Sequence, residues 1–279
     1  MRPVTGRVKL SVSMSALTFG YAFARSSFMV MLTHRLRYLV GVFNYFIYAS
    51  VHWYVWAAVF HEQTTVATWN LAAMQTYACV NWIVRSTYFS NADSLLAARI
   101  RKGEITSDLL RPGSLLLQFY ASAVGEMLFR GLFMGLPVGI AVALAYGLQG
   151  PADVLSAAAF LVSVILAFHL FFALNFITGL AAVLVENLQG FLWAKFLLLQ
   201  FLSGQLLPLE FFPPWARTFM EWSPFPGIAY TPMALYLGRI PHERIAAELT
   251  FQAAWTAVLL ACCQFGWMAV RRRLSALGG

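Results

Sequence analysis

Charged side chains are scarce in this chain. Asp, Glu, Lys and Arg make up 11% of its 279 residues, whereas hydrophobic residues make up 60%. Soluble domains carry about 25% charged residues, so a soluble fold of this composition would leave too much apolar surface in water. The composition therefore predicts a single integral membrane domain over residues 1–279.

Several motifs of nucleotide and metal chemistry are also missing. The chain contains no G-x-x-x-x-G-K-[ST] pattern and no Gly-Lys pair, so it cannot hold a nucleotide by a P-loop. Cys79, Cys262 and Cys263 lie in apolar runs without the spacing of a zinc site or a disulfide framework. The histidines lack paired spacing, and no nucleophile-elbow pattern occurs. We therefore expect no catalytic residue, no metal site and no cofactor bound by this chain.

The net charge of +8 has two possible explanations. A basic chain can bind nucleic acid, but basic residues of membrane proteins also gather on cytoplasmic loops. The location on cytoplasmic loops fits the apolar composition, and we therefore expect no nucleic-acid partner.

Long apolar runs predict an all-α architecture. A membrane-spanning helix needs about 20 mostly apolar residues. The six predicted spans are residues 38–60, 66–84, 131–148, 154–185, 191–207 and 249–270. The third span could begin earlier, and the fourth is long enough to tilt or protrude.

The distribution of Lys and Arg predicts the orientation. Basic residues lie before the first span, between the second and third spans, and after the sixth span. Arg85 is assigned to the connection between the second and third spans. The connections "HEQTT" and "QGPAD" contain none. Both termini and the second connection are therefore expected in the cytoplasm.

Two segments outside the spans have unusual patterns. Apolar residues recur at helical spacing among Ser, Thr and Arg over residues 9–34, which predicts an amphipathic helix in the cytoplasmic interface. Residues 208–244 combine many prolines with Phe, Trp and Tyr. Proline prevents one continuous helix, so we expect short re-entrant helices on the external side, where aromatic rings favour the membrane interface.

A few polar and small residues lie within the spans. Asn44, Tyr48 and His52 follow each other at steps of four and would share one helix face; with Asn175 they could line a translocation path, or equally hydrogen-bond neighbouring helices. Glu126 and Arg130 are also four apart, which favours a structural ion pair. Three glycines in the third span also follow each other at steps of four: Gly131, Gly135 and Gly139. This spacing favours close packing against another helix.

The densest polar stretch is "ARIRKGEITSDLLRPGS", residues 98–114, within the segment 91–112 between the second and third spans. The order of the features resembles the permease subunits of ABC transporters of the ABC-2 type. "IRKGEITSDLLRP" is similar to the pattern of one bacterial subfamily around Gly103, Leu110, Arg111 and Pro112. "SGQLLPLEFFPPWA", followed by "WSPFPGIAYTPMALYLG", resembles the subfamily's stretch after the fifth span.

The resemblance implies a function. Two permeases, identical or different, would pair in the bacterial cytoplasmic (inner) membrane and form the path of an exporter. Separate ABC ATPase subunits would hold ATP and Mg and drive the pair, so this chain would be no enzyme. Segment 91–112 would be a coupling helix seated on the ATPase, which the N-terminal helix would also contact. The implied coupling residues are Arg99, Arg101, Lys102, Glu104, Ile105, Asp108, Leu109 and Arg111.

Other functions remain open at this point. Segment 91–112 could be only a solvated, positively charged loop. A membrane-embedded lipid-modifying enzyme would need clustered acids or histidines, and Asp93, Glu104 and Asp108 match no ligand spacing. An ATP-independent transporter or channel would need no ATPase partner. The sequence does not indicate the substrate.

Overall fold

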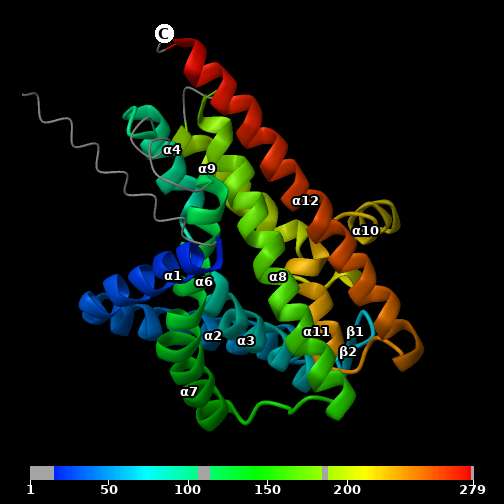
Figure 1. The fold of residues 1–279 in the computed structure, drawn as a ribbon. Coiled ribbons are helices and arrows are strands. Elements are labelled where there is room, and N and C mark those ends of the chain that lie inside the picture. Colours follow the sequence, from blue (N-terminus) through cyan, green and yellow to red (C-terminus); the bar gives the residue numbers. More distant parts are fainter. Residues whose placement is uncertain (1–15, 106–113, 184–187, 278–279) are drawn as a thin grey trace, which may run out of the picture.

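The computed structural model describes residues 16–105, 114–183 and 188–277. Nearly all of these residues are helical (Figure 1). The elements in chain order are α1 (Ala16–Thr33), α2 (Arg35–Val59), β1 (Thr65–Val66), β2 (Trp69–Asn70), α3 (Leu71–Tyr88), α4 (Ala92–Arg101), α6 (Leu115–Arg130), η1 (Gly131–Gly135), α7 (Leu136–Tyr146), α8 (Val154–Leu180), η2 (Ala181–Val183), α9 (Leu188–Leu202), η3 (Leu209–Phe211), α10 (Pro214–Glu221), η4 (Pro226–Ile228), α11 (Tyr230–Tyr236) and α12 (His242–Leu277). The two short strands pair antiparallel between α2 and α3.

Each predicted span overlaps a helix or a continuous helical run. Three runs within the described residues are long and apolar enough to cross a membrane: Leu115–Tyr146, Val154–Leu180 and His242–Arg272. Gln189–Leu202, in α9, is a shorter apolar helix. α3 carries Gln75, Asn81 and Arg85, all buried, which lowers its hydropathy. The all-helical membrane fold is confirmed, and membrane crossing by α2, α3 and α9 stays a prediction.

The third span begins earlier than residue 131. Ser114 caps α6, and its Oγ accepts a hydrogen bond from the Leu117 N–H at 3.1 Å. The π-turn η1 then joins α6 to α7 without a break, just before Pro137, which has no N–H for the ladder. The apolar run looked shorter because Gln118, Glu126 and other polar side chains interrupt it, although Gln118 is buried inside the protein.

One glycine of the repeat, Gly135, packs closely against α3. A Cβ atom on Gly135 would lie 2.4 Å from Thr87 Cγ2, and one on Gly139 would lie 3.5 Å from Ile83 Cγ2. A Cβ atom on Gly131 would meet nothing within 4 Å. The packing prediction is therefore confirmed at Gly135, Gly139 makes an ordinary contact, and Gly131 has no close neighbour among the described residues.

The N-terminal helix packs on the start of the third span. α1 covers the predicted helix from Ala16 onward, and residues 9–15 lie outside the described residues. A Cβ atom on Gly125 of α6 would lie 2.1 Å from the Ala24 carbonyl oxygen of α1, so only glycine allows this approach. Leu17 and Tyr21 remain exposed on α1. Its place in the membrane interface stays a prediction.

The two longest helices, α8 and α12, run side by side (Figure 1). Buried polar groups join them, since Gln252 Nε2 donates to the Ser163 carbonyl at 2.9 Å and Ser163 Oγ donates to Gln252 Oε1 at 2.8 Å. Asp153 caps α8 and also accepts from His242 Nε2 at 3.0 Å, at the start of α12. Hydrogen bonds from the Ser156 backbone and then from His242 lower the pKa of Asp153 to about 2.

The proline-rich segment forms the expected short helices. η3, α10, η4 and α11 follow each other, with a proline in the first turn of α10 and of η4. Gly238, at a φ of 64°, ends α11. α11 packs on α8 and buries Met233 and Leu235 completely, whereas Trp215 and Trp222 near α10 stay exposed. The external, re-entrant placement stays a prediction.

Candidate functional site

The chain turns sharply where α3 ends and α4 begins. Phe89 adopts an extended conformation with φ −60° and ψ 125°, and its N–H still bonds to the Arg85 carbonyl. Asn91 then precedes α4. This connection lies beside α8 and α9, so the base of segment 91–112 is inside the helical body.

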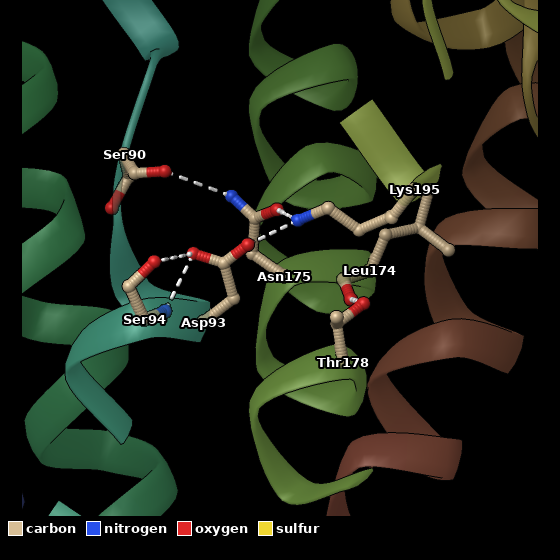
Figure 2. Close-up of polar contacts among 7 residues, drawn as sticks. All are labelled: Ser90, Asp93, Ser94, Leu174, Asn175, Thr178 and Lys195. Carbon is tan, nitrogen blue, oxygen red and sulfur yellow. Dashed lines mark hydrogen bonds and ion pairs between the residues drawn. The ribbon is translucent and has the colours of Figure 1, made fainter. Parts of the chain in front are cut away.

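Five residues from α4, α8, α9 and this connection form a polar junction: Ser90, Asp93, Ser94, Asn175 and Lys195 (Figure 2). The Lys195 ammonium donates to Asp93 Oδ2 and, at 2.7 Å, to Asn175 Oδ1. Asn175 Nδ2 donates to the Ser90 carbonyl at 3.0 Å. Asp93 Oδ1 accepts from the Ser94 N–H at 2.7 Å. The junction thus joins three helices through one continuous network.

The ion pair of the polar junction is largely removed from solvent. The side chains of Lys195 and Asp93 are 16% and 10% exposed. Removing one partner of such a pair leaves an uncompensated buried charge, which costs about 3–5 kcal/mol. The pair therefore holds α4 against α9 chiefly because either charge alone would be unfavourable there.

Close packing on α8 accompanies these polar contacts. A Cβ atom on Gly179 would lie 3.0 Å from the Asp93 carbonyl oxygen and 3.0 Å from Leu96 Cβ. Leu96 and Ala97 are fully buried on the same side of α4. Glycine at this position of α8 lets the two helices approach in the way typical of membrane proteins.

Arg85 lies next to the polar junction and is 3% exposed. Its Nη1 donates to Gln205 Oε1 at 3.3 Å. The guanidinium also lies 5.2–5.6 Å from the ring centroids of Phe89, Phe171 and Phe196. Cation–π contacts of this kind stabilise a cation by about 0.5–2 kcal/mol each.

A pocket of about 260 Å³ opens beside the junction. Arg85 and Lys195 line it together with Asp93, and its wall includes Phe196 and Trp193. Trp193 is 58% exposed, so the pocket reaches the outer surface of α9.

Comparison with known families identifies the chain. A family described as ABC-2 family transporter protein matches residues 46–278, which include the whole junction. The chain belongs to the ABC-2 transporter family. It is therefore a multi-pass membrane protein and the permease component of an ABC transporter, a kind of subunit that associates with an ABC ATPase. No curated protein matches it.

The structure describes only part of the coupling set expected in this permease. Three members lie outside the described residues: Asp108, Leu109 and Arg111. Arg99 and Arg101 are in the last turn of α4, and the Arg99 guanidinium lies 5.4 Å from the Phe119 ring centroid. The charged end of α4 is thus partly packed on α6.

The residues that follow α4 divide between surface and core. Lys102 Nζ lies 4.0 Å from Glu104 Oε1, and both side chains are more than half exposed. Gly103 between them has a φ of 70°, which turns the chain after α4. Ile105 is 2% exposed and belongs to the protein's own hydrophobic core, so its side chain is not part of the exposed surface.

The possible path-lining residues lie in two places. Asn44, Tyr48 and His52 are on α2, where the Tyr48 ring stacks on Trp82 with centroids 4.7 Å apart and Trp82 Nε1 lies 3.2 Å from His52 Nδ1. Asn175 is buried in the polar junction instead. A path lined by these residues stays a prediction.

Glu126 and Arg130 both lie on α6, as expected. The Arg130 guanidinium lies 5.6 Å from the ring centroids of Tyr38 and Phe89, and its Nη1 lies 3.7 Å from Met134 Sδ. The described surroundings of Arg130 are thus mainly aromatic, and its ion pair with Glu126 stays a prediction.

Sequence reasoning overlooked two residues of the site. Lys195 lies in the apolar stretch "FLWAKFLLLQ", and a lysine in such a stretch is rare enough to indicate a role. Arg85 was assigned to the cytoplasmic connection, but it is inside α3 and buried. The assignment was wrong because the apolar run in the sequence ends at residue 84, whereas α3 continues to Tyr88.

Proposed function

We propose that this permease forms half of an ATP-driven exporter in a bacterial inner membrane. It pairs with a second permease, identical or different, and the two form the translocation path. ATP and Mg are held by separate ATPase subunits, and this chain hydrolyses nothing itself. Segment 91–112 is the coupling segment on which the ATPase acts.

The observation that supports this proposal is the buried Asp93–Lys195 pair. It connects the first turn of the coupling segment to α9, and Asn175 connects the same network to α8. A force applied to α4 therefore reaches two helices of the membrane domain directly. A solvated loop would need no such attachment.

The two faces of α4 suit two different tasks. Asp93, Leu96 and Ala97 are buried and attach α4 to the protein body. Leu95 is 48% exposed on the opposite side, and Lys102 and Glu104 follow on the surface. The buried face transmits motion, and the exposed face docks on the ATPase.

Docking and transmission can be separated by two double variants. Glu104→Lys with Asp108→Lys reverses two acidic charges of segment 91–112, and Asp93→Leu with Lys195→Met replaces the buried pair by apolar groups. We expect the first variant to lose ATPase capture in mild detergent. We expect the second to capture the ATPase but to lose coupling, measured as the difference in ATP turnover between the complex and the free ATPase.

The control reverses charges far from α4. Arg217→Glu with Glu221→Arg exchanges an exposed pair of α10 and should leave capture and turnover unchanged. All variants are compared at equal expression and equal size-exclusion profiles. Wild-type capture and turnover in both double variants would reduce segment 91–112 to a solvated loop and overturn the proposal.

Orientation is tested by labelling single cysteines. In a background with Cys79, Cys262 and Cys263 replaced, we expect Lys102→Cys to react with an impermeant thiol reagent only after the cells are permeabilised. Trp215→Cys, at a position that is 77% exposed, should react in intact cells. The opposite pattern would place the coupling segment outside and exclude a cytoplasmic ATPase.

A further inference from the structure

The pocket beside the polar junction carries an excess of positive charge. Two cations, Arg85 and Lys195, line it with one carboxylate, Asp93, and that carboxylate is already paired with Lys195. Among the described residues no acidic side chain lies within ion-pair distance of Arg85. A buried cation whose polar partner is only a neutral amide favours an anion nearby.

The amino end of α4 reinforces this preference. Ser90, Asn91 and Ser94 line the pocket at this end of a 10-residue helix, where the Ser94 N–H and hydroxyl already donate to Asp93 Oδ1. Backbone N–H groups and the positive end of the helix dipole attract anions there. The Asn91 side chain makes no capping hydrogen bond, and the residue is exposed. Both a buried guanidinium and a helix amino end therefore favour negative charge in one pocket.

The shape of the pocket indicates what the anion is attached to. Its volume of about 260 Å³ is below the range of about 300–1,000 Å³ that holds a drug-sized ligand, so it suits a head group rather than a whole lipid. Trp193 and Leu192 line it, and Trp193, Leu197 and Leu198 are exposed along α9. An acyl chain attached to the head group can lie along this surface.

From these observations we infer that the pocket binds a phosphate group, with Arg85 as its charged partner and the amino end of α4 as its second contact. Basic pockets between membrane helices bind anionic head groups in this way. The phosphate is that of an anionic lipid or of a soluble phosphate ester. This inference does not depend on export or on ATPase coupling, because it concerns binding by the permease alone.

Binding would also affect the polar junction. Lys195 and Asp93 both line the pocket, so a phosphate group bound there would compete with Asp93 for the Lys195 ammonium. Occupancy of the pocket is thereby linked to the attachment of α4 to α9.

The test uses delipidated, full-length permease in detergent and counts bound lipid by native mass spectrometry. Phosphatidylglycerol is titrated against wild type, Arg85→Gln and Asn91→Asp. We expect each variant to weaken binding about tenfold or more, because one removes the charged partner and the other adds a negative charge. Asp caps a helix as well as Asn does, so the second variant keeps α4 intact even if Arg85→Gln unfolds.

Matched controls separate charge from composition. Arg217→Gln removes an arginine from the exposed surface of α10 and should bind phosphatidylglycerol as wild type does. Phosphatidylcholine should bind more weakly than phosphatidylglycerol. Equal binding of the two lipids by wild type, or unchanged phosphatidylglycerol binding in Asn91→Asp, would overturn the inference.

Glycerol phosphate distinguishes the two sources of the phosphate. If it does not displace phosphatidylglycerol from wild type, the ligand is a lipid. Trp193→Ala should then also bind phosphatidylglycerol more weakly than wild type does. If it displaces the lipid, and binds Arg85→Gln more weakly than wild type, the pocket takes a soluble phosphate ester. Together with weaker phosphatidylglycerol binding by Arg85→Gln, either result supports a phosphate site at Arg85.

Discussion

Two oppositely charged pairs of the permease differ in burial. In the polar junction, Lys195 and Asp93 are 16% and 10% exposed. In α10, Arg217 Nε lies 2.8 Å from Glu221 Oε1, but these side chains are 47% and 46% exposed. Contact between opposite charges occurs in both places. Only the buried pair has an energetic consequence large enough to hold two helices together.

A third pair lies between these extremes. Arg239 Nε lies 3.8 Å from Glu210 Oε1, and the side chains are 23% and 15% exposed. Tyr230 donates to the same carboxylate oxygen at 2.8 Å, and the Arg239 guanidinium lies 3.8 Å from the centroid of Trp69. Arg239 thus links Glu210, in the proline-rich segment, to Trp69 and Thr68 of the hairpin before α3. Burial, rather than the presence of a pair, thus separates structural from surface electrostatics in this protein.

The largest expected effect comes from Lys195→Met alone. It leaves Asp93 charged and buried, so the free energy of unfolding should fall by about 3–5 kcal/mol. Adding Asp93→Leu should recover most of that loss, because the second charge is then also removed. The measurement is reversible unfolding in detergent for both single variants and the double variant. If the double variant is as unstable as Lys195→Met, packing rather than charge holds the junction.

An intermediate effect is expected from Gly179→Ala in α8. The new methyl group would lie 3.0 Å from the Asp93 carbonyl and Leu96 Cβ, and overpacking of this kind costs about 1–3 kcal/mol. Gly131→Ala is the matched control, because its methyl group would meet nothing within 4 Å. Unfolding in detergent compares them. Equal stability of the two variants would mean that α4 can move away from α8 without lowering the free energy of unfolding.

The smallest effect is expected from the exposed pair. Arg217→Ala should lower the free energy of unfolding by at most about 1 kcal/mol, since solvent screens the pair and ordering two side chains offsets the attraction. Added salt should reduce the difference further. A loss comparable to that of Lys195→Met, insensitive to salt, would contradict the proposed contrast between the buried and the exposed pair.

Much of the fold could be predicted from local patterns. Apolar runs located α2, α8 and α12, and the prolines predicted short helices after α9, because helix formation and its interruption depend on neighbouring residues. The start of the third span was misplaced because Gln118 is polar yet buried. A span predicted from hydropathy ends where polar side chains begin, because these are assumed to face water. A polar side chain that is buried against a neighbouring helix breaks this assumption.

The site was less predictable. Segment 91–112 was singled out for its charges, but the polar junction depends on Lys195 and on Arg85, which the apolar pattern hid. Asn175 was expected beside the residues of α2 and instead bonds to the Ser90 carbonyl. Spacing along one helix places residues on a face, but it does not say which other helix that face meets.

The sequence by itself determined the membrane class, the helical content and the similarity to ABC-2 permeases, because composition and local spacing carry them. Tertiary structure alone decided that Asp93 meets Lys195, 102 residues later, and that Ser90 meets Asn175, 85 residues later. Such contacts arise when whole helices pack, and glycines such as Gly179 permit that approach. A buried charge requires a partner, but only the packing of α4 on α8 and α9 determines which side chain that partner is.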